Sequence, residues 1–134
     1  MFELVAAIAV MGVALVAIFG LATRSVSNTT ESRSASEANR LSQEAIEWLR
    51  RERDDDWDVF LAKTGPWCLV SLDWSRGGAC GAGQIVTGTI YTREVELRRI
   101  DSSNVEAIVV TSWSDQSGGN QSRITAVYTN WRTN

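Results

Sequence analysis

The 134-residue sequence has no histidine, a single lysine and a single proline. Without histidine, the chain lacks the most common general base and the most common protein ligand of transition metals. It also lacks a Gly-x-Ser-x-Gly elbow, a phosphate-binding loop and a set of cysteines with metal-ligand spacing. The sequence therefore predicts no catalytic site and no cofactor, and we do not expect an enzyme.

An excess of positive charge is also missing. Acidic residues outnumber basic ones by 16 to 13, and the net charge is −3. Proteins that bind nucleic acid neutralise phosphates with clustered Lys and Arg, so nucleic-acid binding is not indicated.

Cysteine is scarce, with only Cys68 and Cys80 present. The two residues could be free buried thiols, as in many cytosolic proteins. They could instead form one disulfide that closes a glycine-rich loop, which requires an oxidising compartment. The membrane segment described next favours the disulfide, which would stabilise the fold by about 3 kcal/mol.

What the sequence does contain is a long apolar run near its start. Residues 4–22 read LVAAIAVMGVALVAIFGLA and include no charged side chain. That length suffices for a helix to cross a bilayer. A cleavable signal peptide fits less well, because no basic segment precedes the run and no clear small-residue cleavage site ends it. We therefore expect a retained transmembrane helix.

Glu3 lies at the head of this apolar run. A carboxylate in hydrocarbon costs about 2.5–3.5 kcal/mol on insertion scales. Glu3 could simply lie among the lipid headgroups, since it is close to the chain end. Alternatively, it is retained for a partner, of which the obvious one is the free amino terminus of a neighbouring copy.

The helix can continue beyond the membrane segment. The polar stretch up to about Ser36 contains neither Gly nor Pro. From Ala35 onward, helical spacing brings apolar residues to one face, namely Ala38, Leu41, Ala45, Trp48 and Leu49. Arg residues followed by consecutive Asp residues predict the end of the helix near Arg53. We expect the apolar face to pack on a sheet.

The last third of the chain is typical of antiparallel strands. Alternation and β-branched residues predict strands at Thr89–Ile100, Val105–Trp113 and Arg123–Trp131, with the turn at Ser114–Ser122. The Trp and Phe residues between helix and strands are interpreted as core anchors, with a ligand platform as the alternative.

These elements predict an α+β fold, in which a long N-terminal helix packs through its second half on a three- to four-stranded antiparallel β-meander. We expect three segments: a membrane-spanning half-helix at 1–23, its amphipathic continuation at 24–56, and a disulfide-bearing loop region with a β-sheet head at 57–134. The acidic groups at Asp54–Asp58 and around Asp115 could hold calcium, but acidic loops are more often only solvated, so no metal site is predicted.

Three groups of residues resemble one protein family. They are Phe2-Glu3-Leu4 leading into the apolar helix, Ala45–Arg50 followed by Arg53 and Trp57, and the closing segments Val110–Asp115 and Tyr128–Trp131. Together they are similar to type IV pilins and their pseudopilin relatives, the subunits of helical surface filaments and secretion pseudopili. The likeness covers nearly the whole chain and is strongest at the N-terminus.

The resemblance implies a ladle-shaped subunit that is anchored in the cytoplasmic membrane, processed by a prepilin peptidase and methylated on its new amino terminus. Pilus assembly machinery would then extract it into a homopolymeric helical filament at the cell surface, used for attachment or twitching motility. Glu3, with Met1 and Phe2, would form the assembly contact. The family's glutamate is usually fifth in the mature chain and is third here, which leaves methylation at Met1 open.

Many family members have a helix-loosening proline in the membrane helix. Here Gly12 and Gly20 are the weak points, so we expect any local melting in a filament to centre on them. Two other interpretations stay open: a pseudopilin of a type II secretion system, and a single-pass membrane protein with a binding head.

Overall fold

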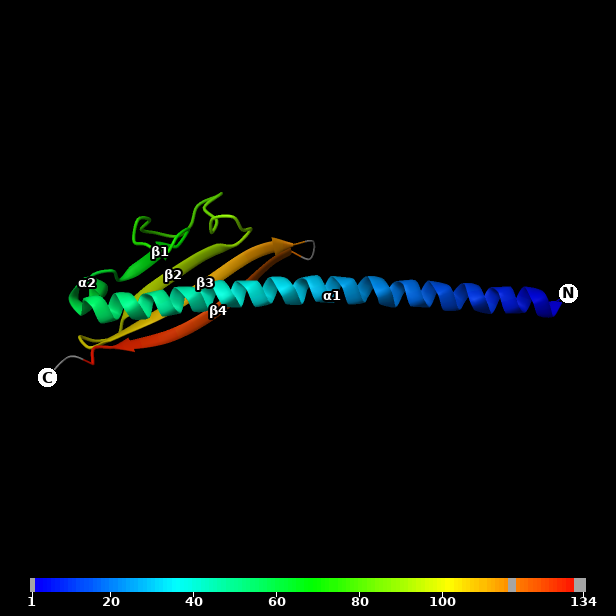
Figure 1. Cartoon of the computed structure of the whole chain (residues 1–134), viewed down its shortest axis with the longest axis horizontal. Coiled ribbons are helices and arrows are strands. Elements are labelled where there is room, and N and C mark those ends of the chain that lie inside the picture. Colours follow the sequence, from blue (N-terminus) through cyan, green and yellow to red (C-terminus); the bar gives the residue numbers. More distant parts are fainter. Residues whose placement is uncertain (1, 116–117, 132–134) are drawn as a thin grey trace. The chain divides into compact units, whose positions relative to one another are not determined.

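The computed structural model describes residues 2–115 and 118–131, and the side chains of residue 5 and residues 21–28 lie outside its described part. Its elements follow the order α1 (Phe2–Asp55), α2 (Trp57–Leu61), β1 (Gly65–Cys68), β2 (Thr92–Arg99), β3 (Asn104–Asp115) and β4 (Gly118–Thr129) (Figure 1). The expected α+β class, with an N-terminal apolar helix and an antiparallel sheet, is confirmed. The sheet has four strands.

The chain divides into two units, which are described separately: a helical unit, residues 1–34, and a globular unit, residues 35–134. Helix α1 runs through 54 residues without a proline. It ends at Asp55 because Asp56 adopts an extended backbone and uses its carboxylate to accept the Val59 N–H at 3.0 Å. Asp56 is thus the N-cap of the short helix α2, where the sequence analysis expected only a loop.

In the globular unit, the apolar face predicted for α1 is confirmed. The five residues of that face are at most 7% exposed: Ala38, Leu41, Ala45, Trp48 and Leu49. The opposite face carries exposed ion pairs of i, i+3 spacing between Glu37 and Arg40 and between Glu47 and Arg50. Exposed pairs of this kind contribute little because solvent screens them, so burial of the apolar face dominates.

The sheet has the strand order β1-β2-β3-β4, and all neighbouring strands are antiparallel. Figure 1 shows the strands lying along the C-terminal part of α1. Every second residue of β2 and β3 is buried against the helix, as period-two side-chain alternation requires. The fully buried residues of these two strands include Val95, Leu97, Val105, Ala107 and Val109.

The predicted turn at Ser114–Ser122 is wrong. Strand β3 continues to Asp115 and β4 begins at Gly118, so Asn120 and Gln121 lie opposite Trp113 and Ser112 within the ladder. Gly and Asn have weak strand propensity, but a ladder already in register recruits them through backbone hydrogen bonds. Gly118 has φ +125°, a conformation that side-chain-bearing residues rarely adopt.

Aromatic residues anchor the core, as expected. Phe60 is buried and meets the Tyr128 ring edge-on at 5.6 Å between centroids. In a second cluster, beside Ala38 and Leu41, Tyr91 meets Trp113 at 5.8 Å. The long segment between β1 and β2 adds Leu69 to the first cluster and Val86 to the second. That segment is therefore part of the core rather than a loose loop.

Candidate functional site

The helical unit exposes an unusual amount of apolar surface. Its large apolar side chains between Phe2 and Phe19, among those that the structure describes, are 55–90% exposed. Burying one such side chain contributes about 1.5–3 kcal/mol. An exposed apolar surface of this extent is rare on soluble monomers and marks a membrane or protein contact. This surface is the candidate functional site.

The length of the apolar helix suits a bilayer. The segment Phe2–Gly20 has 19 residues and is long and apolar enough to cross a membrane. At 1.5 Å per residue it is roughly 28 Å long, close to the thickness of a hydrocarbon core. The helix could therefore anchor the chain in a membrane.

Glu3 lies in the first turn of α1, and its side chain is exposed. A carboxylate there interacts favourably with the positive end of the helix dipole, by roughly 0.3–1 kcal/mol. Phe2 beside it is 90% exposed, whereas Met1, the third residue of the predicted assembly contact, lies outside the described residues. Within the described part of the chain, Glu3 forms no ion pair.

Two sides of the apolar helix differ in side-chain size. One side has large residues spaced alternately by four and three positions: Leu4, Ile8, Met11, Leu15 and Ile18. Glu3 belongs to an adjacent side of smaller residues with the same spacing: Ala7, Val10, Ala14 and Ala17. Spacing of this kind is typical of helices that pack along one another, and small residues allow backbones to approach closely in a membrane.

The two glycines of the helix, Gly12 and Gly20, lie within uninterrupted α-helix. A Cβ atom added at either position would meet nothing within 4 Å. Space inside the helical unit therefore does not explain why glycine occupies these positions. The prediction that they are weak points concerns an assembled filament and stays a prediction.

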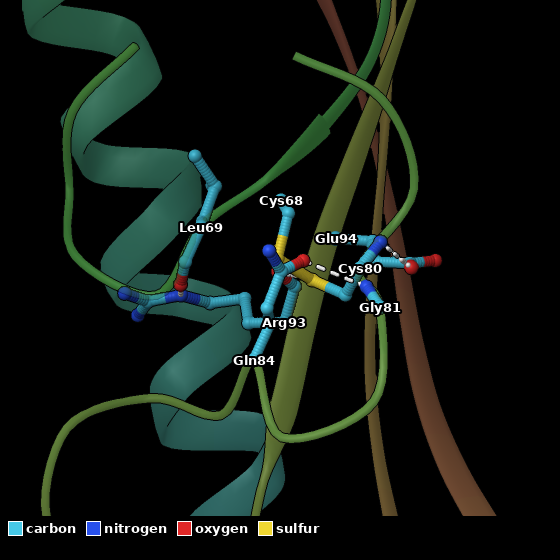
Figure 2. The surroundings of a disulfide bond; sticks show 7 residues. All are labelled: Cys68, Leu69, Cys80, Gly81, Gln84, Arg93 and Glu94. Atoms are coloured by element: carbon cyan, nitrogen blue, oxygen red, sulfur yellow. Dashed lines mark hydrogen bonds between the residues drawn. A yellow bond between two sulfur atoms is a disulfide. The ribbon is translucent and has the colours of Figure 1, made fainter. Parts of the chain in front are cut away.

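Cys68 and Cys80 form a disulfide with a Cα–Cα distance of 4.8 Å (Figure 2). The Cys80 N–H donates to the carboxylate of Glu94 in β2 at 2.6 Å, so this hydrogen bond ties Cys80 to β2. Next to Cys68, the Leu69 N–H donates to the Arg93 carbonyl at 2.8 Å. The bridge thus holds the start of the segment between β1 and β2 against the sheet.

Sequence reasoning missed Arg93, whose side chain is only 2% exposed. Its guanidinium donates to the carbonyl oxygens of Leu41 in α1, at 3.1 Å, and of Leu69, at 3.3 Å, and it pairs with the Glu44 carboxylate at 3.2 Å. Burial lowers the pKa of Arg93, and the Glu44 charge opposes that shift. The sequence could have predicted its burial, because Arg93 lies two positions from both Tyr91 and Val95 and therefore on the same face of the strand as these core residues.

Three tryptophans and the only lysine form one cluster in the globular unit. Lys63 lies over the Trp67 ring at 5.3 Å and over the Trp74 ring at 5.9 Å, and Trp74 packs on Trp48 at 4.6 Å. The indole N–H groups of Trp67 and Trp74 have partners within the chain. Trp67 donates to the Lys63 carbonyl and Trp74 donates to the Glu52 carboxylate. The rings pack on one another, so this cluster supports the core interpretation over a ligand platform.

Two of the acidic residues considered for calcium, Asp54 and Asp115, have structural partners. Asp54 accepts hydrogen bonds from Arg53 and from the Trp131 indole, and Asp115 accepts one from Asn120. No group of three metal-ligating side chains occurs among residues 2–115 and 118–131. Comparisons of the chain with protein-family models, with curated proteins and with solved structures gave no match.

Proposed function

We propose that this chain is a structural subunit that polymerises through its N-terminal helix into a type IV pilus-like filament. The observation that carries the proposal is the exposed apolar surface of α1 from Phe2 to Gly20, which begins at a carboxylate. Before assembly, the cytoplasmic membrane covers this surface. In the filament, the same surface of neighbouring subunits covers it, and the globular units lie outside.

The energetics favour this use of the helix. A simple anchor needs only apolar length, and a carboxylate near its end costs free energy if it enters hydrocarbon. In a filament, Glu3 instead pairs with the amino terminus of a neighbouring subunit, an attraction that is strong in a low-dielectric core. Buried charges are best attested where they set the register of helices rather than where they add stability.

The two sides of the helix support close packing between subunits. The row of large residues that includes Leu4 and Leu15 can lie along the smaller side of a neighbour that includes Ala7 and Ala14. Glu3 lies on that smaller side, where a neighbouring backbone approaches most closely. We further propose that the filament serves attachment or motility, and that a prepilin peptidase and an assembly machine are the partners of the chain.

Electron microscopy of material sheared from cells that produce the chain tests the proposal. We expect thin fibres from the native chain, and mass spectrometry of its N-terminal peptide establishes the mature start. Glu3→Ala should abolish or strongly reduce the fibres. Glu31→Ala is the matched control, because it removes an exposed carboxylate of the same helix beyond the apolar segment, and it should leave assembly unchanged.

Two results would contradict the proposal. One is a chain that stays in the membrane fraction as a monomer, which would favour an anchored binding domain. The other is fibre formation by Glu3→Ala at the native level, which would assign Glu3 to the headgroup region. Structures confined to the cell envelope would favour the pseudopilin alternative.

A further inference from the structure

A hollow of about 420 Å³ lies over strands β2, β3 and β4. Thr92, Ser112 and Gln121 lie side by side in it, because Thr92 pairs with Ser112 in the β2–β3 ladder and Ser112 pairs with Gln121 in the β3–β4 ladder. These three residues alternate with the residues that face α1, so their side chains lie on the outer face of the sheet. Strands are spaced by about 4.8 Å, so the row is roughly 10 Å long.

The lining of this hollow is polar but uncharged. Its side chains bear hydroxyl, amide and aliphatic groups: Thr92, Ser112, Ser114, Asn120, Gln121 and Ile90. None of the described residues that line it is charged, whereas the adjoining hollow over the same strands includes both Glu and Arg side chains. Ile90 is 61% exposed and adds an apolar surface to the site. A concave site with convergent polar groups and some apolar surface is typical of small-molecule binding.

The polar groups of the hollow are largely unused within the chain. Four of its side chains form no hydrogen bond with another described residue: Thr92, Ser112, Ser114 and Gln121. The neighbouring Ser122, which lies outside the hollow, instead donates to Asn39 of α1 at 2.6 Å. Water hydrates the unused groups in the free chain, so a ligand that displaces this water must supply hydrogen-bonding groups of its own.

Trp113 provides a second observation at the same place. It lines the hollow and is only 7% exposed. Within the described part of the chain, its indole N–H is the one buried side-chain polar atom without a hydrogen-bond partner. Folded proteins keep few buried donors in this state, because each lowers stability. Its retention beside unused hydroxyl and amide groups favours a site for a hydrogen-bonding ligand.

We propose that this hollow binds a neutral saccharide of one or two rings. Thr92, Ser112 and Gln121 exchange hydrogen bonds with the ligand hydroxyls, because hydroxyl and amide groups both donate and accept. Ile90 packs on the apolar face of a sugar ring. The uncharged lining disfavours phosphate, carboxylate and amine ligands, since an ion that leaves water needs a counter-charge. The one aromatic ring of the lining is buried, which disfavours a nucleobase, because bases stack on exposed rings.

Nuclear magnetic resonance of the full chain tests this site, in micelles of a detergent without a sugar headgroup. The probes are glucose, galactose, lactose, maltose and cellobiose, followed through the backbone amides of the ¹⁵N-labelled protein. We expect saturable shifts with at least one of these sugars, largest at Ser112 and Gln121. The charged comparators glucuronate and glucosamine should leave both amides unshifted. The test needs no polymerisation, so the proposal stands or fails independently of the filament function.

Variants of the chain locate the contact. Ser112→Ala and Gln121→Ala each remove one set of hydrogen bonds and should weaken binding of the sugar by roughly three- to tenfold. Thr125→Ala is the matched control, because it removes a hydroxyl from the outer face of the same strand β4 but outside the hollow. It should bind the sugar as the native chain does. Thermal unfolding of the three variants checks that they fold, and the amide shifts test the proposal on the unmodified chain.

The proposal is overturned if none of the neutral sugars produces a saturable shift, which would mean that the hollow is only hydrated. It is also overturned if the shifts lie away from Ser112 and Gln121, or if a charged comparator binds as tightly as the neutral sugars. Equal losses of affinity in Gln121→Ala and Thr125→Ala would contradict it as well.

Discussion

Ser42 of α1 and Thr111 of β3 share a hydrogen bond of 2.7 Å between two hydroxyl groups, and both side chains are fully buried. The bond joins residues 69 positions apart and lies where the helix meets the centre of the sheet. A buried hydroxyl costs free energy when it has no partner, so each of these residues satisfies the other. The pair fixes the position of α1 along the sheet more specifically than apolar contacts can.

Removing one of these hydroxyls should therefore cost more than removing both. Thr111→Val keeps the shape of the side chain but leaves the Ser42 hydroxyl buried and unpaired, so we expect a loss of about 1–3 kcal/mol in the free energy of unfolding. The double variant Ser42→Ala with Thr111→Val should recover part of that loss. Urea unfolding of both single variants and the double variant measures the coupling, and strictly additive effects would contradict it.

The buried Arg93 and its partly exposed partner Glu44 should respond differently to substitution. Arg93→Met removes the donors to the carbonyls of Leu41 and Leu69 and should destabilise the globular unit by roughly 1.5–3 kcal/mol, the value of hydrogen bonds to a charged group. The Glu44 side chain is 46% exposed, so Glu44→Gln should cost less than about 1 kcal/mol. Denaturant unfolding compares the two, and equal losses would mean that the ion pair outweighs the bonds to the backbone.

Loss of the disulfide should weaken the globular unit without changing its fold. Cys68 and Cys80 are separated by 12 positions, and a bridge that closes a loop of this size stabilises by about 3 kcal/mol. We expect the double variant Cys68→Ser, Cys80→Ser to melt at a lower temperature in calorimetry. The native chain under reducing conditions should match it. A melting temperature unaffected by reductant would show that the bridge constrains the unfolded chain little.

Stability should fall at high pH because of Tyr128. Burial raises the pKa of Tyr128 to about 12, and its hydroxyl donates to the Ile46 carbonyl at 2.7 Å. The ordinary pKa of tyrosine is about 10, so the folded chain holds this proton more tightly than the unfolded chain. The contribution is fully present below pH 10 and is lost as the pH rises from 10 through 12.

The variant Tyr128→Phe isolates this effect. It should be less stable than the native chain at neutral pH by roughly 1 kcal/mol, the net value of one hydrogen bond. Between pH 10 and 12 the difference between the two proteins should shrink, as followed by urea unfolding at each pH. A constant difference across that range would assign the loss of stability to other groups.

The sequence by itself determined the elements whose signal is local. The apolar residues 4–22 and the helical spacing of Ala38, Leu41 and Ala45 predict a helix. This prediction needs only local sequence, because residues three or four positions apart lie on the same face of a helix. The alternation of Tyr91, Val95 and Leu97 likewise specifies a strand with one buried face. The two cysteines left two possibilities open, free thiols or one disulfide, and the structure has the disulfide.

Only the tertiary structure decided the features that depend on distant residues. Asn120 to Ser122 have the composition of a turn, yet they belong to β4 because β3 offers a backbone ladder in register with them. Arg93 is buried because carbonyl oxygens from α1 and from the segment after β1 converge on it. The periodicity of apolar residues can be read from neighbouring positions in the sequence. The burial of a given side chain depends instead on segments that are far apart in the sequence.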